Sequence, residues 1–117
     1  MKHFIRACAC ILALAGASTS QAETWSGFFG IEMIEPLAVW QGGMVRLKLD
    51  APLVSAQCGT TQVVDFMFTQ GTQETRGAVI GALYMALAAD KKIRLYVIDN
   101  ACSPAGAPMF TGVDVFR

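Results

Sequence analysis

The chain has 117 residues, of which 54% are hydrophobic, and its formal net charge is zero. This length allows one small domain with a modest core. Nucleic acid is excluded as the expected partner, because only Lys91, Lys92 and Arg94 cluster and they form no extended basic face.

The N-terminus has the three parts of a secretory signal peptide. Lys2 and Arg6 give a basic start, residues 7–17 form an apolar or small run, and residues 20–22 (SQA) place small side chains at two cleavage-site positions. This pattern predicts cleavage after residue 22. The run is too short to anchor the chain in a bilayer, and a buried N-terminal helix, the alternative, leaves both cations unexplained. We therefore expect a secreted or periplasmic protein without membrane insertion, with residues 23–117 as its domain.

Cleavage of 22 residues from 117 leaves 95. The loss of Lys2 and Arg6 lowers the Lys and Arg count from nine to seven, against nine Asp and Glu, so the net charge becomes −2. Cys58 and Cys102 remain, in a compartment that permits disulfides. Their bond would close a loop of about 45 residues, which the chain-entropy argument values at roughly 4 kcal/mol. We expect this disulfide, and two free buried thiols are the alternative.

The first half of the domain contains three expected strands. Ile31, Met33 and residues 39–40 indicate extended structure, and Pro36 places that segment at an edge or a bend. The glycines of "QGG" (residues 41–43) favour a hairpin turn. Residues 44–50 (MVRLKLD) alternate strictly and predict the clearest strand, which Pro52 ends. Residues 63–68 (VVDFMF) are the third.

The second half contains a helix and two further strands. The helix begins at Thr72 or Thr75 and ends near Ala89, where "DKK" places cations at its C-terminal end. Residues 93–98 (IRLYVI) and 109–116 (MFTGVDVF) are the fourth and fifth strands. We therefore expect a mainly β chain with one helix, in the order β-β-β-α-β-β. That is the order of the OB-fold, a small five-stranded barrel; an open α+β sandwich is the alternative.

The expected helix is apolar around its whole circumference. Residues 78–89 carry no charge, and Val79, Leu83 and Leu87, with Ile80, form one stripe. A single small sheet covers only one face of such a helix, so a second copy of the chain is expected on the other. The predicted oligomer contacts are the small residues Ala78, Ala82, Ala86 and Ala89. The alternative is that alanine is there only as a good helix former.

Several spaced motifs resemble the family of subtilase cytotoxin B subunits and related small secreted proteins of Gram-negative bacteria. They are W-x-G at residues 25–27, GG-x-V at 42–45, "ALYMALAADKKIRLYV" at 82–97 and P-x-F at 108–110. The resemblance implies an OB-like barrel, and a homo-oligomeric ring of five copies with the helices at its centre. It also implies binding to cell-surface glycans. The loop after W-x-G reads "FFGIE", without the polar pocket residues of that family, and Ala107 replaces its aromatic residue.

Catalytic chemistry is not expected. The only histidine, His3, is lost with the signal peptide, so the domain has no imidazole for a triad or a typical zinc site. The acid pairs Glu32 with Glu35 and Asp99 with Asp114 are expected to be solvated side chains rather than a glycosidase pair. We expect no catalytic residue, metal or cofactor.

The sequence favours a secreted or periplasmic, non-catalytic binding module of the toxin B-subunit type that recognises glycans. The predicted ligand contacts are Phe28 and Phe29, on whose rings a sugar can stack, and Asp99 and Asn100, which supply polar groups to its hydroxyls. Core packing is the alternative role for the aromatic residues. The alternative function is a small envelope structural or inhibitor-like protein that acts through a protein–protein contact.

Overall fold

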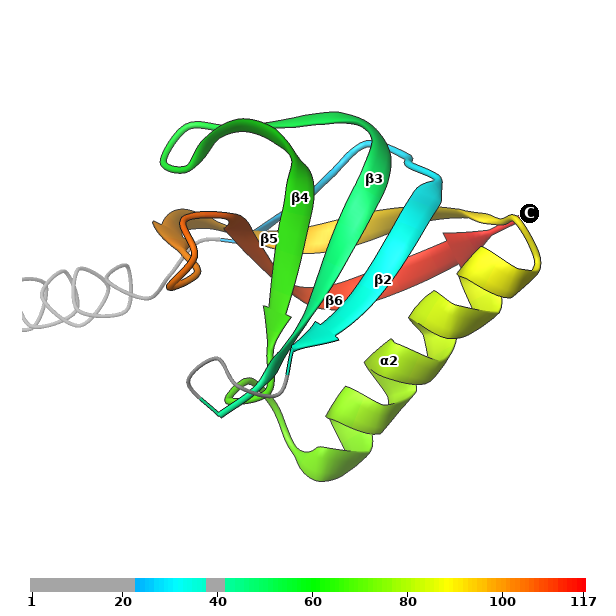
Figure 1. The fold of residues 1–117 in the computed structure, drawn as a ribbon. Coiled ribbons are helices and arrows are strands. Elements are labelled where there is room, and N and C mark those ends of the chain that lie inside the picture. Colours follow the sequence, from blue (N-terminus) through cyan, green and yellow to red (C-terminus); the bar gives the residue numbers. More distant parts are fainter. Residues whose placement is uncertain (1–22, 38–41) are drawn as a thin grey trace, which may run out of the picture.

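The computed structural model describes residues 23–37 and 42–117, so the expected signal peptide (residues 1–22) lies outside the described residues. Within them, the chain forms six strands and one helix (Figure 1). In chain order they are β1 (Glu23–Trp25), β2 (Ile31–Leu37), β3 (Met44–Ser55), β4 (Gly59–Met67), α2 (Gln73–Ala88), β5 (Lys92–Cys102) and β6 (Pro108–Phe116). The prediction of a mainly β chain with one helix is confirmed.

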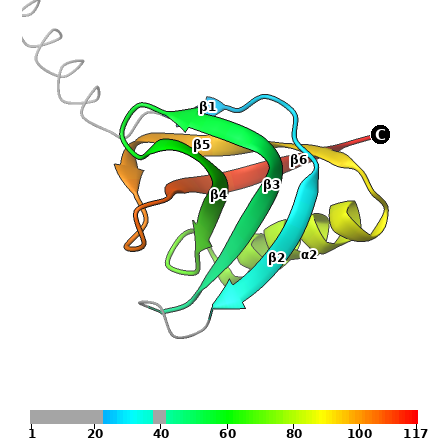
Figure 2. The same ribbon diagram turned by 45° about the horizontal axis from the view of Figure 1, so that its top comes forward.

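The six strands form one sheet in the order β1-β5-β6-β4-β3-β2. Neighbours are antiparallel except β4 and β6, which pair in parallel at Asp65 and Met109. The sheet bends over itself, so that β2, β3 and β4 cross in front of β5 and β6 (Figures 1 and 2). In this pairing β1 and β2 are edge strands and the sheet is not closed, so the predicted five-stranded OB-type barrel is not confirmed.

A short connection between β1 and β2 hydrogen-bonds to strands on both sides. The N–H groups of Phe29 and Ile93 each donate to the other residue's carbonyl at 2.8 Å, which ties the connection to β5. On the other side, the Asp50 N–H of β3 donates to the Gly30 carbonyl at 2.9 Å. A Cβ atom at Gly30 would lie 2.7 Å from Asp50 Oδ2. That oxygen accepts from Lys92 Nζ at 3.0 Å, and this hydrogen bond lowers the pKa of Asp50.

The core lies between the two parts of the bent sheet and is closed by α2. The alternation predicted for residues 44–50 is confirmed, because Val45, Leu47 and Leu49 are buried while Arg46 and Lys48 are half-buried. Buried side chains from β4, β5, β6 and α2 complete the core: Val64, Phe66, Val79, Leu83, Ala86, Ile93, Leu95, Val97 and Phe110.

Three strand ends differ from the predictions by four residues or more. β3 continues through Pro52 to Ser55, and the register with β4 shifts between Lys48 and Leu53. Such an irregularity accommodates a proline, which cannot donate to the ladder. β4 begins at Gly59, earlier than the predicted Val63. β5 continues to Cys102, four residues past the predicted end at Ile98, so Asp99 and Asn100 lie in the strand. The strand β1, which has only three residues, is not among the predicted strands.

Proline and glycine act in the β2–β3 region as predicted. Pro36 lies in β2, which is an edge strand. Gly42 and Gly43 have φ angles of 89° and 97°, in the region that favours glycine. A Cβ atom at Gly43 would lie 2.5 Å from Phe68 Cδ2. The rest of that connection, residues 38–41, falls outside the described ranges.

Both ends of α2 are capped. The Thr72 side chain accepts a hydrogen bond from the Thr75 N–H at 3.2 Å, which makes Thr72 the N-cap residue. At the other end Asp90 has a φ angle of 53°. The N–H groups of Asp90 and Lys91 donate to the carbonyls of Leu87 and Ala86, the pattern of a Schellman motif.

The inward stripe of α2 differs by one residue from the predicted stripe. Val79, Leu83 and Ala86 are buried, whereas Leu87 remains 37% exposed. Ala86 has no exposed surface, so its predicted role as an oligomer contact is wrong: it packs in the chain's own core. Ala78 and Ala89 are exposed and Ala82 is half-buried, so these three remain on or near the outer surface.

The predicted disulfide between Cys58 and Cys102 is confirmed, with a Cα–Cα distance of 5.7 Å. It joins the turn between β3 and β4 to the end of β5. No helix in the part of the chain that the structure describes is long and apolar enough to cross a membrane.

Candidate functional site

The four predicted ligand-binding residues have different environments. Phe28 is 61% exposed, but Phe29 is only 9% exposed and belongs to the core, so a ligand contact by Phe29 is contradicted. The hydrogen bonds between Phe29 and Ile93 fix the backbone there, and the ring points inward. Asp99 and Asn100 are exposed near the other end of β5.

The structure does not bring the two predicted halves of the site together. Phe29 is opposite Ile93, and Asp99 lies six residues farther along β5. At about 3.3 Å per strand residue, this separation is on the order of 20 Å. One sugar ring therefore cannot contact both Phe28 and Asp99.

Phe28 instead belongs to a row of aromatic side chains on the outer surface, which we call the aromatic row. Its members, with the arginine between them, are Tyr96, Trp25, Arg94, Phe116 and Phe28. The ring centroids of Trp25 and Tyr96 are 4.7 Å apart, and those of Phe28 and Phe116 are 4.9 Å apart. The Arg94 guanidinium lies 4.4 Å from the Trp25 ring centroid and 5.6 Å from that of Phe116.

Strand alternation explains how this row forms. Ile93, Leu95 and Val97 of β5 point into the core, so Arg94 and Tyr96 lie on the opposite face. Trp25 of β1 is the direct partner of Tyr96, and Asp114 of β6 is the partner of Arg94. Arg94 Nε and Nη2 both donate to Asp114 Oδ2, at 3.1 and 2.9 Å, which holds the guanidinium in position.

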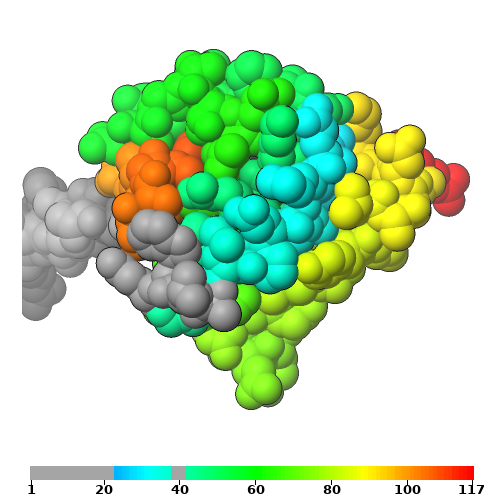
Figure 3. Space-filling view, in the orientation of Figure 1, coloured from blue at the N-terminus to red at the C-terminus, as the bar shows by residue number. Residues whose placement is uncertain are grey.

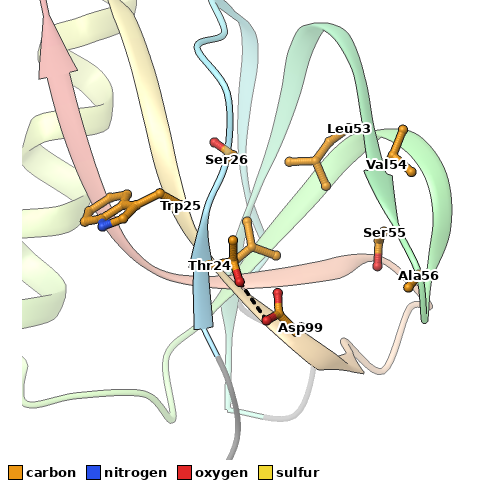
Figure 4. A pocket seen from close by; sticks show the side chains of 9 residues that line it. Thr24, Trp25, Ser26, Leu53, Val54, Ser55, Ala56 and Asp99 are labelled. Atoms are coloured by element: carbon orange, nitrogen blue, oxygen red, sulfur yellow. Dashed lines mark hydrogen bonds between the residues drawn. The ribbon is translucent and has the colours of Figure 1, made fainter.

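A groove of about 200 Å³ lies next to β1, on the side away from the Trp25 ring. It is lined by Thr24, Trp25, Ser26, Leu53, Val54, Ser55, Ala56, Val97 and Asp99. Figure 4 shows the groove between β1 and the turn end of β3, with the Trp25 indole directed away from Leu53 and Asp99. The backbone of Trp25, rather than its ring, therefore borders the groove.

The groove combines an apolar floor with a polar rim. Leu53 and Val97 are 6% and 8% exposed and form the floor. On the rim, the Thr24 hydroxyl donates to Asp99 Oδ2 at 2.7 Å. The Ser26 hydroxyl donates to the Gly27 carbonyl and accepts from the Leu95 N–H, so both functions of this group are used.

A buried acid, Asp65, is the centre of a hydrogen-bond network. Its carboxylate accepts from Arg46 Nε and Nη2 at 2.8 and 3.0 Å and from Ser103 Oγ at 2.6 Å. The Ser103 hydroxyl accepts in turn from the Ala107 N–H, so the network reaches the loop before β6. The hydrogen bond to Asp65 raises the pKa of Arg46. The Asp65 carboxylate itself has no exposed surface, whereas the Arg46 side chain is 24% exposed.

The space-filling view shows the β2 side of the molecule, where the helix and the bent sheet form one continuous surface (Figure 3).

Among residues 23–37 and 42–117, no group of three or more His, Cys, Asp or Glu side chains is placed to hold a metal ion. The candidate sites are the two solvent-facing features described above, the aromatic row with its exposed rings and the groove with its apolar floor.

Sequence reasoning identified Phe28 and Asp99 but missed the rest of both features. Trp25 and Tyr96 meet only because β1 pairs with β5, and a three-residue strand leaves almost no periodic signal. The alternation in "IRLYVI" is a signal that could have been used, because it places Arg94 and Tyr96 together on the outer face of the strand. Comparison with protein-family models, curated proteins and solved structures finds no match to this chain.

Proposed function

We propose that this chain is a secreted or periplasmic, non-catalytic binding module that recognises a cell-surface glycan through the aromatic row. The carrying observation is the clustering of exposed rings on one outer face. Trp25, Phe28 and Phe116 are 41%, 61% and 37% exposed, and each touches the next through a ring or the Arg94 guanidinium. Large apolar groups gathered on a surface indicate an interaction site.

The chemistry of the aromatic row suits a sugar. The apolar face of a pyranose ring packs on aromatic carbon, while its hydroxyls need donors and acceptors in fixed positions. Arg94 and Asp114 provide both kinds of group between the rings. Because β5 and β6 are paired along most of their length, these groups are held on a rigid support.

The proposal includes an OB-type barrel, a fold that binds oligosaccharides. Residues 23–37 then act as one long, bent first strand. Its first part pairs with β5 and its second part with β3, and the connection at Phe29 and Gly30 hydrogen-bonds to both. The parallel pairing of β4 with β6 at Asp65 and Met109 supports this arrangement.

An array of cell-surface glycans followed by calorimetric titration of the best-bound glycan tests the proposal. We expect Trp25→Ala and Phe116→Ala each to weaken binding about tenfold, which corresponds to about 1.4 kcal/mol, because a stacking surface is lost. Met33→Ala is the matched control, since Met33 is 41% exposed on β2, outside the row and away from α2. Its affinity should equal that of the wild type.

Circular dichroism of each variant separates lost binding from lost structure. An array on which the wild-type protein retains no glycan would contradict the proposal. The same holds if folded Trp25→Ala and Phe116→Ala variants bind as tightly as the wild type. In either case the protein–protein function becomes the better explanation.

A protein contact is the second candidate, and the outer face of α2 favours it. Met85 and Tyr84 are 54% and 44% exposed there, and Leu87 is 37% exposed. No atom outside the helix lies within 4 Å of where a Cβ atom would be at Gly77 or Gly81, so a neighbouring backbone can approach closely. We propose that a second copy covers this face, in a homo-oligomer that the family resemblance makes a pentamer.

Size-exclusion chromatography with light scattering on the exported protein measures the assembly directly. We expect the mass of five chains, and we expect Met85→Glu to reduce it to one folded chain, because the contact would bury an unpaired charge. Thr60→Glu, on exposed β4 surface, is the matched control and should leave the mass unchanged. A wild-type protein that is monomeric at high micromolar concentration contradicts this assembly.

A further inference from the structure

The groove next to β1 lies between two strand edges that have no strand partner among the described residues. β1 pairs with β5 on one side only. β3 pairs with β2 as far as Leu49, and residues 53–55 have their β4 partners on one side and the groove on the other. Unpaired strand edges present backbone donors and acceptors, which a further strand can use.

The hydrogen bonds of β1 show which of its backbone groups face the groove. The Ser26 N–H donates to the Leu95 carbonyl of β5 at 2.8 Å. Successive residues of a strand direct their N–H and C=O groups to opposite edges. The backbone groups of Trp25 therefore point away from β5, toward the groove, in agreement with its place in the groove lining.

The opposite edge is less suited to pairing, which makes β1 the docking edge. Pro52 of β3 has no N–H group, so that strand offers an incomplete set of donors. Its side chains contribute instead: Leu53 forms part of the floor, and Val54, which is 80% exposed, extends the apolar surface at the rim.

The charge of the groove is one-sided. Among the described residues, Asp99 is the one charged residue that lines it. The Thr24 hydroxyl donates one hydrogen bond to Asp99 Oδ2, and the carboxylate can accept further hydrogen bonds. A partner that fills the groove is therefore expected to bring a Lys or Arg side chain to this end.

We infer that the groove binds an extended peptide segment of a partner protein, by strand addition to β1. The peptide backbone pairs with the N–H and C=O groups of Trp25. Alternate apolar side chains lie over Leu53 and Val97, and a basic side chain lies beside Asp99. This mode of recognition takes affinity from main-chain hydrogen bonds and specificity from the side-chain positions. It is independent of glycan binding, which uses the opposite face of β1.

Fluorescence polarisation with a defined peptide pool tests this inference. The probe is a pool of fluorescein-labelled hexapeptides in which Val, Ile or Leu alternates with Lys or Arg. The control pool has the same sequences with alternate backbone nitrogens methylated, which removes the donors for strand pairing. We expect saturable binding of the first pool, and at least tenfold weaker binding of the methylated pool.

Two variants and one exchange measurement locate the complex. Asp99→Asn should weaken binding of the basic pool several-fold and leave unchanged the binding of a pool with Thr in place of Lys and Arg. Phe116→Ala, in the aromatic row, should leave peptide binding unchanged whether or not glycan binding fails. Hydrogen exchange at the Trp25 amide should slow when the pool is bound, because that N–H becomes hydrogen-bonded.

Three results would overturn the inference. They are absence of saturable binding by the unmethylated pool, equal binding of the methylated pool, and unchanged exchange at the Trp25 amide. Displacement of the bound peptides by a glycan selected on the array would also overturn it, since the groove would then be the sugar site.

Discussion

Replacing Asp65 by Ala is expected to lower the free energy of unfolding by about 3–5 kcal/mol. The Asp65 side chain is fully buried and its partner Arg46 is 24% exposed, so the substitution leaves a largely desolvated guanidinium without its counter-charge. It also removes the acceptor for the Ser103 hydroxyl, which supports the loop before β6. Urea unfolding followed by circular dichroism measures the change.

Two further variants make this test specific. Glu32→Ala removes an ion pair with Lys48 at 3.5 Å, in which both side chains are nearly half exposed, and should cost about 1 kcal/mol or less. The double variant Asp65→Leu with Arg46→Met should recover most of the loss, because it leaves no buried charge unpaired. A loss from Asp65→Ala as small as that from Glu32→Ala would show that the buried network contributes little.

Loss of the disulfide is the second large effect that we expect. The double variant Cys58→Ala with Cys102→Ala should lower the free energy of unfolding by about 2–5 kcal/mol. The bond spans 44 residues and joins the turn after β3 to the end of β5, so its removal frees a large part of the unfolded chain. Replacing both residues avoids leaving a lone reactive thiol.

Thermal and urea unfolding of the variant, and of the wild type with and without reductant, measure this contribution. The reduced wild type should behave like the double variant. Mass analysis of the exported wild-type protein after alkylation should find no free thiol. Two alkylated cysteines in the native protein, or equal stability of oxidised and reduced forms, would contradict the expectation.

Elements whose signal is local and periodic could be predicted from the sequence. The alternation of residues 44–50 and 93–98 located most of β3 and β5, and Thr72 marked the start of α2. The pairing of the two cysteines followed from their number, once residues 1–22 were set aside.

The missing parts depend on tertiary contacts. β1 exists as a strand only because β5 is beside it, and three residues are too few to show a period. Ala86, rather than Leu87, is fully buried, in a helix that contacts β2 and β6. Asp65 occupies a position in β4 that would normally be apolar, and only its contacts with Arg46 and Ser103 account for it.

For the same reason, the two glycan-contact segments were grouped wrongly. The prediction combines Phe28 and Asp99 because their chemistry is complementary, an aromatic ring for stacking and a carboxylate for sugar hydroxyls. In the structure, Phe28 and Asp99 are separated by the length of β5. The alternation of side chains in β1 also puts the Trp25 ring and the groove on opposite faces of that strand. A shift of one residue in strand register moves every side chain of the strand to the other face of the sheet. The amino-acid composition of the chain does not determine this register.

The pairing of β1 with β5 also has a consequence for the order in which strand pairs form during folding. The contacts that hold β1 join residues 69 and 75 positions apart, such as Ser26 with Leu95 and Thr24 with Asp99. Contacts this distant require most of the chain to be restrained before they form, because the entropy of closing the loop must be overcome first. The hairpin of β3 and β4 and the pair β5 and β6 need no such closure. Both the aromatic row and the groove include β1, so we expect both surfaces to form late in folding and to be absent from a partly folded chain.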